Sequence, residues 1–104
     1  MKRTIGLGIL LVGVIATGAN AAGDAKAGRF KAQTCLGCHG VPDYTNVYPS
    51  FRVPKLGGQH PEYIVAALRA YAAGQRVHGT MHANAATLSD QDMADIAAFF
   101  SSFD

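Results

Sequence analysis

Both cysteines of the chain lie in one short segment, Cys35-Leu36-Gly37-Cys38-His39. Two thiols three residues apart lie about one helical turn from each other, so both can reach the vinyl groups along one edge of a porphyrin. The adjacent histidine can then bring its imidazole beneath the iron, which is the arrangement of c-type haem attachment. The segment therefore predicts one covalent haem c, with Cys35 and Cys38 as thioether sites and His39 as the proximal ligand.

Three other uses of these residue types compete with haem attachment. A redox dithiol expects a preceding strand and a parallel α/β pattern, and the sequence has neither. A structural zinc site commonly needs a second Cys or His pair at comparable spacing, and His60, His78 and His82 do not form such a pair. A disulfide would give His39 no role. These alternatives stay open, and haem attachment is favoured over all of them.

The N-terminus has the pattern of an export signal. Lys2 and Arg3 precede an apolar, glycine-rich run over residues 5–19, and Ala19-Asn20-Ala21 is a small-x-small cleavage site. The run is shorter than the roughly 17–25 residues of a membrane span. We expect residues 1–21 to be removed and residues 22–104 to form one domain in the periplasm, with an uncleaved anchor as the alternative.

Removal of the signal would change both the charge and the size of the protein. The formal charge of +2 falls to zero, because two of the nine Lys and Arg are lost and all seven Asp and Glu remain. No basic cluster is left, so no nucleic-acid partner is expected. Domains of this size bury only about 60% of their unfolded surface, so we expect the porphyrin to complete the core and the apoprotein to fold poorly.

The apolar pattern predicts three main helices. The first has Asp24 as its N-cap and runs through Ala25–Gln33 into the Cys35 turn; the second runs from Pro61 to a stop at Gly74; the third follows the N-cap Ser89. Two apolar stripes recur at helical spacing: Ile64, Ala67, Leu68 and Tyr71, and then Met93, Ile96, Ala97 and Phe100.

Residues 40–60 show no sustained period and are expected to be a loop around the haem edge. Their aromatic residues Tyr44, Tyr48 and Phe51 suit an apolar wall. The segment from Gly74 to Leu88 is also expected to be a loop.

The sixth iron ligand has five candidates: Met81, Met93, His60, His78 and His82. Met93 lies on a buried stripe, where methionine usually fills the core. Met81 lies in the second predicted loop and is preferred. His82 is its competitor, but neighbours in an extended loop point in opposite directions. His60 and His78 are expected to face solvent, and His60 to help cap the second helix.

A set of further motifs accompanies the haem segment: Ala27-Gly28, His39-Gly40, Pro54-x-Leu56-x-Gly58-Gln59, Tyr63, Gly74-x-Arg76, Met81 and Leu88-Ser89-Asp90-x-Asp92. Together they resemble the small bacterial c-type cytochromes with His/Met ligation, and most closely the single domains that occur doubled in dihaem periplasmic cytochromes. The resemblance covers nearly all of residues 22–103. Many relatives carry two successive methionines where this chain has Thr80-Met81.

The resemblance implies the all-α cytochrome c fold, with the first and last helices crossing and Phe30 against Phe99 or Phe100. It implies Met81 as the distal ligand and the Pro54 carbonyl as the acceptor of the His39 Nδ1–H, which would orient the imidazole.

The function expected is one-electron Fe(III)/Fe(II) transfer without enzymatic activity or a small-molecule substrate. The partners expected are transient redox donor and acceptor proteins, such as a membrane-bound oxidase or reductase, with Lys26, Arg29, Lys31 and Lys55 as candidate steering charges. A haem subunit of an oxidoreductase complex and a ligand-binding or peroxidatic haem are the alternatives.

Overall fold

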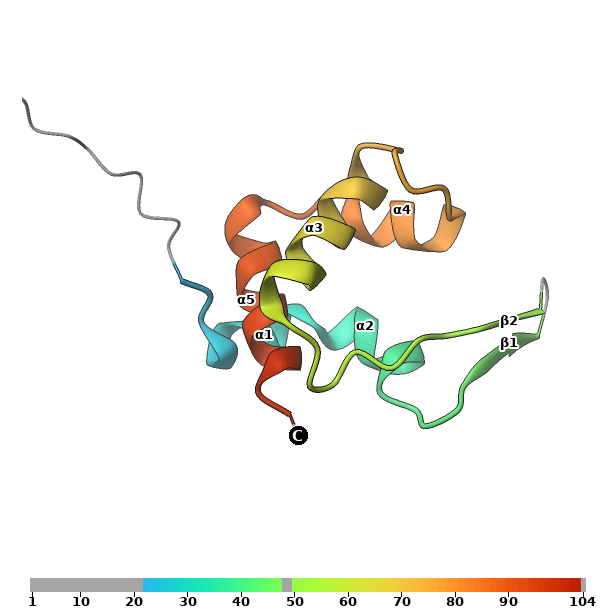
Figure 1. The fold of residues 1–104 in the computed structure, drawn as a ribbon, viewed down its shortest axis with the longest axis horizontal. Coiled ribbons are helices and arrows are strands. Elements are labelled where there is room, and N and C mark those ends of the chain that lie inside the picture. Colours follow the sequence, from blue (N-terminus) through green and yellow to red (C-terminus); the bar gives the residue numbers. More distant parts are fainter. Residues whose placement is uncertain (1–21, 48–49, 104) are drawn as a thin grey trace, which may run out of the picture.

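The computed structural model describes residues 22–47 and 50–103, and the predicted export signal at residues 1–21 lies outside them. The described residues form helices and one short hairpin (Figure 1). The elements are α1 (Ala25–Lys31), α2 (Gln33–His39), β1 (Thr45–Val47), β2 (Ser50–Arg52), α3 (Pro61–Ala72), α4 (Gly79–Ala85) and α5 (Asp90–Ser101). Within this part of the chain, no helix has the length and apolarity needed to cross a bilayer.

The second predicted helix is confirmed as α3. It begins at Pro61 and ends at Ala72, and Gly74 follows with a φ of +75°. The N–H of Gln75 donates to the Ala70 carbonyl at 2.9 Å across this left-handed residue. Glycine adopts that conformation without a Cβ penalty, so the helix stops where the sequence predicts.

The third predicted helix is confirmed as α5. The Ser89 hydroxyl accepts from the Asp92 N–H, and the Asp92 carboxylate accepts from the Ser89 N–H, both at 3.0 Å, which completes a capping box. The predicted stripe of this helix lies in the core, where its members are at most 4% exposed: Met93, Ile96, Ala97 and Phe100. Met93 is therefore a core residue, as expected.

The first predicted helix is two helices in the structure. The chain turns at Ala32, whose N–H donates to the Gly28 carbonyl and whose own carbonyl accepts from the Cys35 N–H at 2.9 Å. Ala32 is completely buried. No glycine or proline marks this break in the sequence; it falls at a residue that packs in the core.

The predicted loops also contain regular structure. Strands β1 and β2 pair antiparallel, with Asn46 opposite Phe51, and these two residues are partly buried while their strand neighbours are exposed. The helix α4 occupies part of the second predicted loop. Strands of three residues show too little alternation to be predicted, so the sequence indicated only a loop here. Tyr48 lies outside the described residues.

The first and last helices cross as expected, but not through Phe30. A Cβ on Gly28 would lie 1.9 Å from the backbone oxygen of Asp95, so α1 and α5 approach closer than any side chain at this position allows. Phe30 is 69% exposed and lies outside the core. The expected contact of Phe30 with Phe99 or Phe100 is therefore wrong, because glycine rather than an aromatic residue forms the crossing.

A charged cluster joins the same two helices. The Asp95 carboxylate is almost fully buried and accepts hydrogen bonds from the Asp24 N–H (2.8 Å), the Lys31 ammonium (2.6 Å) and the Gln91 amide (2.8 Å). Lys31 also pairs with Asp92 at 2.9 Å. Lys31 is one of the cations predicted to steer partners, but in the structure its ammonium group holds α1 against α5.

Candidate haem site

A cavity of about 510 Å³ opens between α2, α3, α4 and the hairpin, within the range of roughly 300–1,000 Å³ typical of cofactor sites. In Figure 1, α2 and α4 lie on the same side of the crossing helices, α2 below and α4 above, and the hairpin extends beyond them. Four core residues form part of the apolar lining of the cavity: Ile64, Leu68, Ile96 and Phe100.

Helix α2 brings the two cysteines to this cavity. Cys35 and Cys38 are three residues apart on one helical face, both line the cavity, and both are partly buried free thiols. Burial raises the pKa of the Cys35 thiol. A redox dithiol works through a thiolate of lowered pKa, so this environment argues against that use and fits covalent attachment of a porphyrin along α2.

His39 ends α2 and lines the same cavity. Its Nδ1 lies 2.8 Å from the Pro54 carbonyl oxygen, which can only accept, so Nδ1 carries the proton. The other ring nitrogen, Nε2, then keeps its lone pair for a metal. A hydrogen bond of this kind holds a metal-ligating histidine in one tautomer and one orientation.

Met81 belongs to α4 and lines the cavity. In Figure 1, α4 lies across from α2. The expectation of an extended loop here is wrong, since Gly79–Ala85 is helical. Successive side chains of a helix point about 100° apart, so the side chains of Met81 and His82 still point in different directions. His82 is exposed, and its Nδ1 donates to the Tyr71 carbonyl at 2.8 Å, so this histidine braces α4 against α3.

Two further histidines differ from expectation. His60 is exposed as predicted, but its side chain makes no capping hydrogen bond to α3. His78 does not face solvent; it lines the cavity, its Nδ1 accepts from the Met81 N–H at 3.3 Å, and its ring lies 4.7 Å from that of Phe51. Histidine is an uncommon N-cap residue, so no strong sequence signal marked this position.

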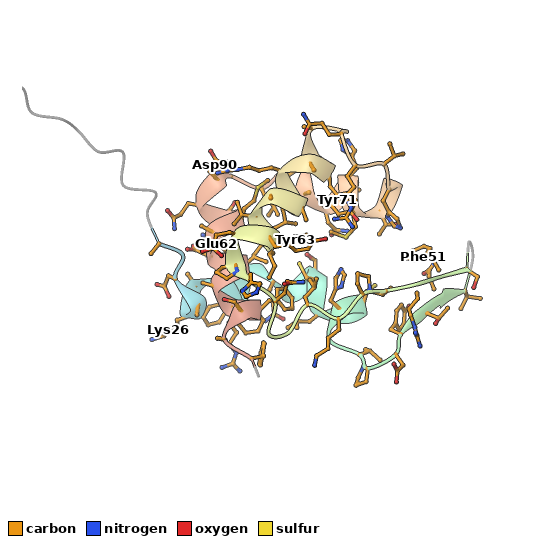
Figure 2. The ribbon with its side chains drawn as sticks, in the orientation of Figure 1. Lys26, Phe51, Glu62, Tyr63, Tyr71 and Asp90 are labelled. Atoms are coloured by element: carbon orange, nitrogen blue, oxygen red, sulfur yellow. The ribbon has the colours of Figure 1, made fainter. Side chains whose placement is uncertain are left out.

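Among the described residues that line the cavity, those with Lys, Arg, Asp or Glu side chains are all cations: Lys31, Arg52, Lys55 and Arg76. Arg76 lies 4.9 Å above the Tyr71 ring, and Arg52 is 3.9 Å from the exposed Asp43. In Figure 2, Lys26, Glu62 and Asp90 lie at the end of the molecule away from Phe51 and the hairpin. Lys31 is already paired with two carboxylates, so Arg52, Lys55 and Arg76 are the cations that match the anionic propionates of a haem, whose ring is apolar.

The family model for cytochrome c matches residues 25–104. The chain is 45% identical over 84 residues to cytochrome c-554(548) of Halomonas halodenitrificans, which covers 78% of this chain and 98% of that relative. It is also 45% identical over 84 residues to cytochrome c4 of Pseudomonas aeruginosa, and 40% identical over 93 residues to cytochrome c4 of Azotobacter vinelandii.

The matches to the two c4 proteins each cover 81% of this chain but only 40% and 43% of the relative, so the chain spans less than half of their length. It resembles one part of these longer proteins and nearly the whole of cytochrome c-554(548). With the cysteines, His39 and the apolar cavity in place, the chain belongs to the cytochrome c family and is an electron carrier with one covalent haem c.

Proposed function

We propose that the protein is a periplasmic one-electron shuttle in which Cys35 and Cys38 bind the haem as thioethers and His39 and Met81 ligate its iron. The observation that carries the proposal is one apolar cavity with the Cys35–His39 segment on one wall and Met81 on another. A bound haem supplies the Fe(III)/Fe(II) couple. A thioether on one side of the iron favours the reduced form and raises the reduction potential.

The chain's own residues fix this site in one geometry. The Pro54 carbonyl holds the His39 ring through Nδ1, which leaves Nε2 for the iron. The buried core residues Ile64 and Ile96 form part of the apolar cavity wall, which would keep water away from a bound ring. If His39 and Met81 both ligated the iron, the haem would have no open position for a reactant, and this supports electron transfer to and from protein partners rather than catalysis.

The ligand assignment is tested by replacing Met81 with alanine. The oxidised wild-type protein should show the weak far-red band of sulfur bound to ferric haem, and Met81→Ala should lose it. The reduced variant should also bind carbon monoxide readily, because one axial position is open. Met93→Leu is the matched control, since Met93 is a buried core methionine and its replacement should keep the band. Survival of the band in Met81→Ala would refute the assignment.

Export is supported by the signal pattern at residues 1–21. Expression of the full chain together with haem maturation should give a periplasmic protein whose mass equals residues 22–104 plus one haem. A protein in the membrane fraction that retains residues 1–21 would support the anchored alternative. Size exclusion of the native material separates a free shuttle from a subunit of an oxidoreductase complex.

A further inference from the structure

Helix α4 is too short to be stable through its own hydrogen bonds. It has seven residues, and isolated helices below about 12–15 residues are marginal in water. Its conformation, and with it the place of the Met81 side chain, must therefore come from contacts with the rest of the protein. Two histidine side chains make such contacts: His82 bonds the Tyr71 carbonyl of α3, and His78 lies at the start of the helix.

His78 caps α4 through the very residue whose side chain enters the cavity. Its backbone is extended (φ −160°, ψ 113°), and its Nδ1 accepts the Met81 N–H at 3.3 Å. This N–H belongs to the first turn of the helix and has no carbonyl partner within it. An Nδ1 that accepts carries no proton, so the ring proton lies on Nε2.

The His78 ring is itself held in place from two sides. The Phe51 ring of the hairpin meets it edge to face, with centroids 4.7 Å apart and planes at 88°. The Tyr71 ring of α3 lies 6.3 Å away at 75°. These are ordinary geometries for interacting aromatic rings. Because the ring is packed between two other elements, the nitrogen that receives the Met81 N–H has a defined position.

We propose that His78 is a positioning residue that holds Met81 over the haem by capping α4. The inference rests on the proposed role of Met81 as distal ligand. Without the cap, the first turn of α4 loses a hydrogen bond on Met81 itself. Loss of an N-cap corresponds to about a fivefold shift of a local equilibrium. The population in which Met81 has left the iron should rise by that factor.

Three variants separate the cap from the packing of the ring. His78→Asn keeps an N-cap acceptor without the ring, His78→Phe keeps a ring without the acceptor, and His78→Ala removes both. His60→Ala is the matched control, because His60 also precedes a helix but makes no side-chain capping bond. The readouts are the far-red band of the oxidised protein, the rate of carbon monoxide binding to the reduced protein, and hydrogen exchange of the Met81 amide.

The proposal expects the Asn variant to lie closer to wild type than the Ala variant in all three readouts, and the His60 control to match wild type. The Phe and Ala variants should weaken the far-red band, bind carbon monoxide about fivefold faster and exchange the Met81 amide about fivefold faster. A wild-type-like Phe or Ala variant, or an Asn variant as impaired as Ala, overturns it. If wild type lacks the band, or Met81→Ala keeps it, then the proposed ligand fails instead, so the two failures are distinguishable.

Discussion

Replacement of Asp95 by asparagine tests whether a buried charge holds α1 against α5. Asp95 is 3% exposed and accepts from the Asp24 N–H, the Lys31 ammonium and the Gln91 amide. Asparagine has nearly the same shape, but it has no charge and turns one of the two acceptor atoms into a donor. The variant therefore resembles the protonated carboxyl without changing the volume of the site.

The pKa of Asp95 gives the size of the effect. The Asp24 N–H, followed by Lys31 and Gln91, lowers this pKa from 3.8 to about 2. One pKa unit corresponds to 1.36 kcal/mol, so the folded state gains about 2 kcal/mol from the ionised form. Because the pKa in the folded state is lower than in the unfolded chain, this gain is complete above about pH 4. It is lost as the pH falls towards the folded-state pKa, with about half gone at pH 3.

The assay is urea unfolding of the holoprotein, followed by far-ultraviolet circular dichroism at pH 7, 4 and 3. Asp95→Asn should lower the free energy of unfolding by about 2 kcal/mol at pH 7, and the gap to wild type should close by about half at pH 3. The control is Asp90→Asn. Asp90 forms an exposed pair with Arg69 at 3.4 Å, so its replacement should cost at most about 0.5 kcal/mol. A gap for Asp95→Asn that is under about 0.5 kcal/mol, or the same at pH 3 as at pH 7, would refute the reasoning.

Two further changes probe the helices in thermal unfolding experiments. Gly28→Ala should destabilise the fold by about 1–3 kcal/mol or more, because the added Cβ would meet the α5 backbone. The control is Gly37→Ala, which has open space and should be neutral or mildly stabilising. Equal effects of the two substitutions would contradict the close crossing of α1 and α5. Ser89→Ala should cost about 1 kcal/mol through loss of the α5 N-cap, and an unchanged melting temperature would show that the capping box contributes nothing.

Local signals in the sequence predicted much of the fold. The start of α3 at Pro61, its end at Gly74 and the capping box at Ser89 all depend on the backbone chemistry of a few adjacent residues, and all are present. The buried stripe of α5, which includes Met93, follows from helical periodicity in the same way.

Features that depend on residues far apart in the chain were missed or mispredicted. The helix α4 has a weak apolar pattern, so the sequence predicts a loop for its segment. The helix is held by the bond from His82 to α3 and by its N-cap residue His78, which packs against the hairpin. His78 was expected to face solvent, yet Phe51 and Tyr71 pack against it. The α1–α5 crossing uses Gly28 rather than Phe30, because two backbones in close contact leave no room for an aromatic ring.

The sequence by itself determined the chemistry of this protein, because haem attachment requires two cysteines and a histidine at a spacing that one helical turn imposes. It also indicated which helices would exist, since caps and periodicity act within a few residues. Only the tertiary structure decided how α4 presents Met81 to the cavity and that His78 caps it. Those arrangements arise where separate elements pack together, and no local pattern encodes such distances.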